Sequence, residues 1–428
     1  PNLKRMADEG VSTESYCVLP VWTPTNWATL MTGANTGTHS VSRWFVNTPH
    51  PRNAKSTVSA FVGNAVTAET VFEALDRAGL KSVAIHYPAG GPSRAPMAHT
   101  IDPFGHPEFG SSPFEVTPAH GYTNLGDVQN SYRIELQPAR RWKNLPNSNS
   151  PPLEFPVPIV TKKEGENQTL VGLAIDSGGR GLDTVVLCAH RDGATELGRS
   201  EIGQWSPWIN REFTVEGKSV PATFRIRTVE LASDGSRLRL YRSQVMYREG
   251  FTEPPELAQK LTDRFGPYLE HASIYPLSWG VGDLETALDE VDYHCTWTVN
   301  VGNYLLHEEG YSLLYTHIHL FDYLNHEFLA DMDPSAPGYD REKSEFGWKV
   351  YREAYKVADR LFGKLLEAAD DETAIVIVSD HAAYPQKRAA DPYKLLQDNG
   401  FLVLKEGFNK RFYPSEAFDQ VDMERTKV

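Results

Sequence analysis

Two segments in the second half of the chain each end in an aspartate with a histidine close behind it. The run LLYTHIHLFDYLNH contains Asp322 and His326, and the run TAIVIVSDHAA contains Asp380 and His381. Both runs are apolar before the aspartate, and in a parallel sheet such strands deliver the residues that follow them to the carboxyl edge, where α/β proteins bind ligands. Carboxylate oxygen and imidazole nitrogen suit Zn²⁺, and two such ions can hold the attacking and leaving oxygens of a phosphoryl group. The four side chains therefore predict a two-metal site.

Each pair also has an ordinary explanation. An aspartate four residues before a histidine is a spacing that occurs often by chance. An aspartate directly after a strand is explained equally well as the N-cap of the next helix. The metal-site prediction therefore depends on the two pairs occurring together.

A third group that could do chemistry lies near the start of the chain, in the segment PVWTPTNWATLMTG. Thr23 precedes Pro24 and a predicted helix that begins near Asn26. Helix N-termini attract phosphate because their first N–H groups are unpaired, and a bound metal can activate a hydroxyl there. The alternative is that Thr23 or Thr25 only caps the helix. The distant Asp/His pairs favour Thr23 as a nucleophile.

The elements expected to position these residues alternate in the α/β manner. Apolar periodicity and capping residues predict helices over 1–10, 26–33, 67–79, 254–266 and 347–369, with Thr67 as the candidate cap of the third. Apolar runs predict strands over 14–21, 81–88, 311–322 and 373–380, the last fully buried. Short alternating runs over 169–176, 183–190, 222–231 and 237–245 predict further strands.

This pattern predicts an α/β fold with a mostly parallel central sheet flanked by helices and a β-rich insertion or cap. We expect residues 1–90 to form the first part of the α/β core, 91–270 the insertion, and 271–428 the second part of the core.

Composition limits the classes of partner. The chain has 42 basic and 56 acidic residues, a net charge of −14, and no basic track for a nucleic-acid polymer. A small phosphorylated substrate is compatible with this charge because bound metal ions can override it locally. The three cysteines are too few for a disulfide framework. No run approaches the roughly 20 apolar residues that span a bilayer, so we expect a soluble protein of undecided compartment and oligomeric state.

The motifs resemble those of the alkaline phosphatase superfamily, specifically the type I phosphodiesterase/nucleotide pyrophosphatase family. The resemblance covers the α/β portions at both ends and rests on motifs that occur in family order: PNLKRMADEG, Thr23-Pro24-x-x-Trp27-Ala28-Thr29-Leu30, Thr32-Gly33, Thr38-His39, Asp322-x-x-x-His326 and Ser379-Asp380-His381. It implies an alkaline-phosphatase-like fold and a phospho-threonine intermediate on Thr23. It also implies two divalent ions, zinc or else manganese, one held by Asp380 and His381 and the other by Asp322 and His326.

The resemblance also implies ligands that the sequence lacks, namely an aspartate just before Pro1 and a histidine beyond Val428, so the chain is expected to be truncated at both ends. The asparagine that the family usually carries after the equivalent of His39 is missing; Asn26 is the expected replacement for binding substrate, with Asn47 as the alternative. The segment Cys17-Val18-Leu19-Pro20 has neither the spacing nor the arginine of a sulfatase nucleophile motif.

The sequence therefore predicts a metal-dependent phosphoester hydrolase, with preference for monoester, diester or phosphonate left open. The alternatives are a catalytically silent scaffold and a phosphoryl transferase of the same superfamily. The remaining histidines are expected to be packing or ligand-orienting residues, as at His317 and His319, or ordinary surface or satisfied residues, as at His86, His99, His106, His120 and His190.

Overall fold

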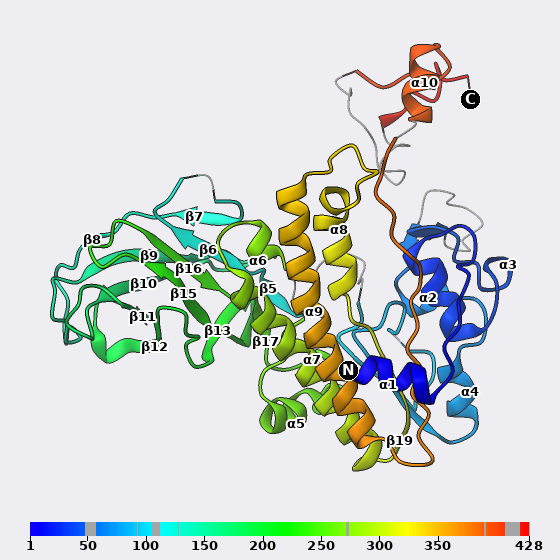
Figure 1. Cartoon of the computed structure of the whole chain (residues 1–428), viewed down its shortest axis with the longest axis horizontal. Helices are drawn as coiled ribbons and strands as arrows, with labels where there is room; N and C mark the ends of the chain where they lie inside the picture. Colours follow the sequence, from blue (N-terminus) through cyan, green and yellow to red (C-terminus); the bar gives the residue numbers. More distant parts are fainter. Residues whose placement is uncertain are drawn as a thin grey trace.

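The computed structural model describes residues 1–47, 57–91, 93–104, 112–126, 128–270, 274–388, 391–406 and 420–427. Figure 1 shows a β-rich part at one end of the molecule, a group of long helices beside it, and a smaller α/β part on the far side of those helices. The mixed α/β class is confirmed. The sequence predicts a mostly parallel central sheet, whereas most strand pairs in the described residues are antiparallel.

The sheet nearest the candidate chemistry has the strand order β18-β4-β3-β19. Its strands are β3 (Lys81–Ile85), β4 (Ala98–Ile101), β18 (Thr252–Glu253) and β19 (Tyr311–Thr316). β3 runs parallel to both β4 and β19, and β18 is antiparallel to β4. The parallel strands therefore share a carboxyl edge, and the residues that follow each of them meet there.

Long helices pack beside this sheet. They are α5 (Glu256–Phe265), α7 (Leu284–His307), α8 (Leu320–Met332) and α9 (Arg341–Ala368), and their apolar faces share one core with β3, β4 and β19. α1 (Asn2–Glu9) packs on α9, where Asp359 accepts hydrogen bonds from the Leu3 N–H at 3.0 Å and the Asn2 amide at 3.2 Å. The predicted helices over 1–10, 254–266 and 347–369 are thus confirmed, although α9 begins six residues earlier than predicted.

The β-rich part contains three antiparallel sheets around a second core. The first joins β8 (Gln137–Pro138), β9 (Leu153–Ile159), β10 (Gln168–Ile175), β11 (Thr184–Cys188) and β12 (Glu196–Glu201). The second joins β5 (Glu115–Thr117), β13 (Ile209–Val215), β14 (Lys218–Phe224) and β17 (Val245–Tyr247). The third joins β6 (His120–Thr123), β7 (Ser131–Arg133), β15 (Ile226–Leu231) and β16 (Leu238–Arg242), with β6 and β7 parallel.

Charged side chains connect this β-rich part to α7. Arg227, which is 1% exposed, forms ion pairs with Glu285 and Asp289 of α7. The hydroxyl of Tyr241 donates to the buried carboxylate of Glu290 on the same helix. The expected domain boundaries stay a prediction, and β4, β18 and α5 lie in the α/β core although their residues fall within 91–270.

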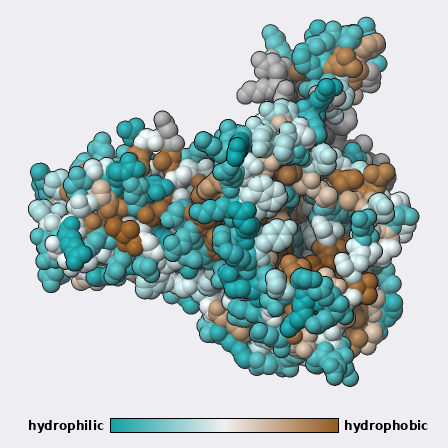
Figure 2. Space-filling view, viewed as in Figure 1, coloured by the Kyte–Doolittle hydropathy of each residue, from teal (hydrophilic) through white to brown (hydrophobic). Residues whose placement is uncertain are grey.

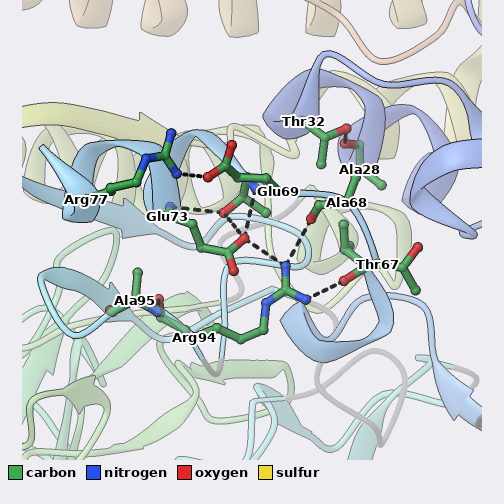
Figure 3. A network of polar contacts seen from close by, with 12 residues as sticks. Ala28, Thr32, Thr67, Ala68, Glu69, Glu73, Arg77, Arg94 and Ala95 are labelled. Carbon is green, nitrogen blue, oxygen red and sulfur yellow. Dashed lines mark hydrogen bonds and ion pairs between the residues drawn. The ribbon is translucent and has the colours of Figure 1, made fainter.

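α4 (Val71–Arg77) covers the start of β3, and its N-terminus shows a correction to a predicted cap. The cap is Thr70 and not Thr67: its side chain accepts from the Glu73 N–H, while Glu73 accepts from the Thr70 N–H at 2.9 Å. Arg94 pairs with Glu73 at 2.8 Å and also donates to the carbonyl of Ala68 (Figure 3). Thr67 instead donates to the Thr38 carbonyl.

The remaining elements are short. They are α2 (Thr23–Thr32), α3 (Thr36–His39), α6 (Tyr275–Ser278), α10 (Pro392–Asp398), the 3₁₀ turns Gly63–Ala65 and Gly193–Thr195, and the two-stranded pair β1 (Phe45–Asn47) and β2 (Thr57–Ser59). No described helix is both long enough and apolar enough to cross a membrane.

Two predicted strands are wrong. Residues 14–21 form no strand, and Tyr16 and Leu19 are 92% and 77% exposed. Residues 373–380 are extended but unpaired: in the described part of the chain, no backbone–backbone hydrogen bond involves 374–380, and Val376 is 81% exposed. Apolar side chains reach the surface of Figure 2 in the region where Figure 1 draws this segment. The strand over 373–380 was predicted from its apolar composition alone. A strand also needs a neighbouring strand to pair with, and the described residues do not supply one.

Candidate active site

Thr23 is the first residue of α2, one position after the N-cap residue Trp22. Pro24 follows it and has no N–H. The first N–H of the helix to donate to an earlier carbonyl is that of Asn26, which bonds to the Trp22 carbonyl at 3.1 Å. The helix thus begins three residues earlier than predicted. Thr23 is half-buried, and its Oγ1 lies 3.0 Å from Nε2 of His381, which is 358 residues away in sequence. The structure therefore brings two of the predicted site residues into direct contact.

The hydrogen bonds of His381 define which of its nitrogens carries a lone pair. Nδ1 lies 3.0 Å from the Ala382 carbonyl oxygen, and because a carbonyl can only accept, Nδ1 carries the hydrogen. In the neutral ring, Nε2 then accepts from the Thr23 hydroxyl. Oδ2 of Asp380 lies 3.2 Å from the same nitrogen. With the ring neutral, two electron-rich atoms face each other here, and either a proton on Nε2 or a bound cation relieves this contact.

Asp322 and His326 lie on α8 and not at the end of a strand. β19 ends at Thr316, so Asp322 stands in the first turn of the helix and His326 one turn later. Oδ2 of Asp322 is 3.4 Å from Nε2 of His326 and 2.9 Å from Nε2 of His319. The predicted strand over 311–322 was therefore too long by six residues. Spacing of four residues on a helix places both side chains on one face.

Electrostatic interactions connect the two pairs. Burial opposes ionisation of Asp322, but the hydrogen bond from His319 and the charges of His326 and His381 together lower the pKa of Asp322. Burial raises the pKa of Asp380, an effect that His381 opposes and the charge of Asp322 adds to. Asp322 and Asp380 thus influence each other's ionisation, and His381, which affects both, also contacts Thr23.

The donor set fits divalent metal ions in type, as two separate pairs of one carboxylate and one imidazole each. In the described residues, no three of these four donors lie within 4.8 Å of one another. Each pair by itself offers two protein ligands, fewer than the three or four usual for zinc.

The amide of Asn26 is occupied by the backbone around α2. Its Oδ1 accepts from the Val18 N–H at 2.9 Å, and its Nδ2 donates to the Trp22 carbonyl at 3.1 Å. The side chain is buried. These two hydrogen bonds fix Val18 and Trp22 against the helix. Because Trp22 directly precedes Thr23, Asn26 helps to position Thr23. Its role in substrate binding stays a prediction.

His39 is a buried structural residue behind the same helix. Its Nδ1 accepts from the Val41 N–H at 3.1 Å, so Nε2 carries the hydrogen and donates to Thr29 Oγ1 at 3.0 Å. Burial lowers the pKa of His39, which keeps the ring neutral. The motif residues Thr29 and His39 thus fix α2 against the turn that follows it.

Sequence reasoning missed a second cluster at the same edge of the sheet. His86 directly follows β3, Asp102 directly follows β4, and with Glu270 they form a buried group whose ligand atoms all lie within 4.8 Å of one another. His86 is only 3% exposed, so its assignment as an ordinary surface or satisfied histidine was incomplete. Burial and the charge of Glu270 raise the pKa of Asp102 well above its usual range. The available signal was a histidine or acid directly after each strand, as in KSVAIH and AHTID.

Comparison with known proteins gives one match. The sequence model of a family described as type I phosphodiesterase / nucleotide pyrophosphatase matches residues 1–149 and 238–428. The match omits a stretch inside the β-rich part. No curated protein and no solved structure matches the chain.

Proposed function

Because the chain belongs to the type I phosphodiesterase/nucleotide pyrophosphatase family, we propose that it is a metal-dependent hydrolase of phosphoric esters with Thr23 as its nucleophile. The observation that carries this proposal is the contact between Thr23 Oγ1 and His381 Nε2 at 3.0 Å. The hydroxyl sits at a helix N-terminus, where unpaired N–H groups stabilise phosphoryl oxygens, and against the residue pair proposed to hold a metal.

Thr23 is proposed to attack phosphorus through Oγ1. Oγ1 loses its proton as it bonds to phosphorus, the bond from phosphorus to the leaving oxygen breaks, and that oxygen takes up a proton as it departs. Water then attacks the phospho-threonine: the water oxygen bonds to phosphorus, the bond between phosphorus and Oγ1 breaks, and a proton from the water returns to Oγ1. The lone pair of His381 Nε2 that faces the hydroxyl in this structure is also the one that would bind an ion, so the hydroxyl would give up this hydrogen bond when the ion is bound. Asn26 is proposed to hold Trp22 in place and to offer its second amide hydrogen to the substrate.

Asp380 and His381 would hold one ion, and Asp322 and His326 the other, with zinc the expected metal. When bound, divalent ions at these positions would lower the pKa of the attacking hydroxyl and offset the charge on the phosphoryl oxygens. His319 is proposed to orient Asp322 through the contact of 2.9 Å at Oδ2. An alkaline-phosphatase-like arrangement of the core, with parallel strands ending at this site, is the finer fold that we propose.

The test is hydrolysis of bis-p-nitrophenyl phosphate and p-nitrophenyl phosphate by the complete protein with added Zn²⁺ or Mn²⁺. Thr23→Ala should reduce kcat by about 10³-fold or more because it removes the hydroxyl proposed to form the intermediate. Thr23→Ser should retain measurable turnover. Thr32→Ala is a matched control at the opposite end of α2, where the hydroxyl bonds to the Ala28 carbonyl, and it should keep near-normal kcat.

Equal activity of wild type and Thr23→Ala would contradict the nucleophile. A metal-loaded wild type that cleaves neither ester would direct attention to phosphonate substrates or to phosphoryl transfer, which product analysis with added alcohol acceptors distinguishes. A protein that binds no metal and has no activity would favour the silent scaffold.

A further inference from the structure

We infer that His86, Asp102 and Glu270 form a binding site for one further divalent cation, separate from the residues of the candidate active site. One ligand atom from each of the three side chains lies within 4.8 Å of the other two. The group combines one imidazole with two carboxylates, a donor set that suits first-row ions such as Zn²⁺ or Mn²⁺ better than Ca²⁺, which prefers oxygen alone.

The backbone explains how the three donors meet. β3 and β4 are parallel neighbours in which Ile85 pairs with Ile101, and the His86 N–H bonds to the Ile101 carbonyl at 2.9 Å. The next residue of each strand, His86 on one and Asp102 on the other, therefore emerges side by side. Glu270 reaches the pair from the segment after α5.

Burial makes these groups costly without a cation. His86, Asp102 and Glu270 are 3%, 1% and 6% exposed. Within the part of the chain that the structure describes, Oδ2 of Asp102 has no hydrogen-bond partner, and only Oδ1 is satisfied, by the Ser112 hydroxyl at 2.7 Å. A buried carboxylate oxygen without a hydrogen-bond partner is destabilising, and more so when it is charged. A metal ion would satisfy it directly.

The nearest described ammonium group serves a different carboxylate. Lys162 pairs with Glu115 at 3.0 Å, and Gln244 bridges Glu115 at 2.9 Å and Glu270 at 3.1 Å. Glu115 thus belongs to the same buried region but has its own cation.

A small cavity lies beside the cluster. His86 and Glu270 line it together with His294 and His319, and its free volume is about 10 Å³. That volume holds about one water molecule, which could complete the coordination of an ion bound by three protein ligands. His319 also contacts Asp322 of the candidate active site. The side chain of His319 therefore lies between the cavity and Asp322.

The experiment measures metal content after equilibration with Zn²⁺ alone, and separately with Mn²⁺ alone, in a variant that lacks the candidate active-site carboxylates, Asp322→Asn/Asp380→Asn. This background should retain about one ion per chain. Adding Asp102→Asn should remove that ion, whereas adding Glu115→Gln, a matched change of a neighbouring buried carboxylate, should leave it bound.

Thermal unfolding provides a second measurement. Zn²⁺ should raise the Tm of the background variant and of its Glu115→Gln derivative but not that of its Asp102→Asn derivative. If Asp102→Asn fails to fold, Glu270→Gln in the same background takes its place. No bound ion in the background variant, or an ion that survives both Asp102→Asn and Glu270→Gln, would overturn the inference. Neither result depends on hydrolysis, so it leaves the proposed function to its own test.

Discussion

Replacing Glu290 by glutamine should make the protein more stable than wild type at neutral pH, by an amount that disappears in acid. Glu290 is 2% exposed; its Oε2 accepts from Tyr241, and its Oε1 has no described hydrogen-bond partner. Burial raises the pKa of Glu290 to about 6 from 4.5, even though Arg225, Tyr241 and Arg242 oppose the shift. The folded protein thus holds this proton more tightly than the unfolded chain does.

The sign and size follow by linkage. Below about pH 4.5 the carboxyl is protonated in both states and contributes no penalty. Between about 4.5 and 6 the native state binds more protons than the unfolded state, so stability falls as pH rises; above about 6 the penalty is complete. A difference of about 1.5 pH units corresponds to about 2 kcal/mol. Glu290→Gln cannot ionise, so its stability relative to wild type should rise by about 2 kcal/mol from pH 4.5 to pH 7.

The assay is urea unfolding followed by tryptophan fluorescence, for both proteins, at several pH values across this interval. Taking the difference between variant and wild type cancels the titration of every other group. Tyr241→Phe is the companion variant: it removes a hydrogen bond that lowers the pKa of Glu290, so the decline in stability should extend to higher pH. A difference between Glu290→Gln and wild type that stays constant with pH, or shrinks as pH rises, would refute the reasoning.

Three further outcomes are expected. Gly172→Ala should destabilise the β-rich part by about 1–3 kcal/mol in urea unfolding, because an added Cβ would overlap the buried ring of Phe155 on the paired strand; an unchanged midpoint would mean that the ring moves aside freely. Thr70→Ala should cost about 1 kcal/mol through loss of the cap that bonds the Glu73 N–H, and Thr70→Ser should restore most of it. Chelation should abolish ester hydrolysis and added Zn²⁺ should restore it; activity that persists in excess chelator would argue against metal dependence.

Periodicity predicted the helices well where one face is buried along the whole length. α9 and α5 repeat their apolar residues at helical spacing, and this pattern requires no knowledge of the rest of the chain. Local capping was harder. Thr67 and Thr70 both precede the same apolar run, and only the glutamate three residues after Thr70 distinguishes the true cap.

Strands could not be predicted with the same success, because a strand needs a partner that the segment does not encode. The run over 373–380 is as apolar as β3, yet β3 lies between two strands and this run pairs with none among the described residues. The juxtaposition of Thr23 with His381 likewise depends on the whole topology. It was expected from the chemical types of the residues and their family order, and not from any local pattern.

The cluster of His86, Asp102 and Glu270 was missed because its residues become neighbours only in the folded protein. His86 and Asp102 each directly follow a short apolar run, and the register of β3 against β4 makes them neighbours. The role of Asp322 as a metal ligand stays a prediction, and its position on a helix places His326 beside it by helical spacing and not by strand pairing.

The unpaired segment before Asp380 has a consequence for metal affinity. Asp380 and His381 follow directly on residues whose backbone groups bond to no other strand in the described chain and whose apolar side chains are exposed, so the placement of this pair depends on side-chain contacts such as that of His381 with Thr23. An ion that needs these two ligands binds only those molecules in which both are correctly placed. Its apparent dissociation constant is therefore the intrinsic one divided by the fraction of such molecules. Any polypeptide strand that paired with residues 374–378 would increase this fraction and tighten metal binding without touching the metal.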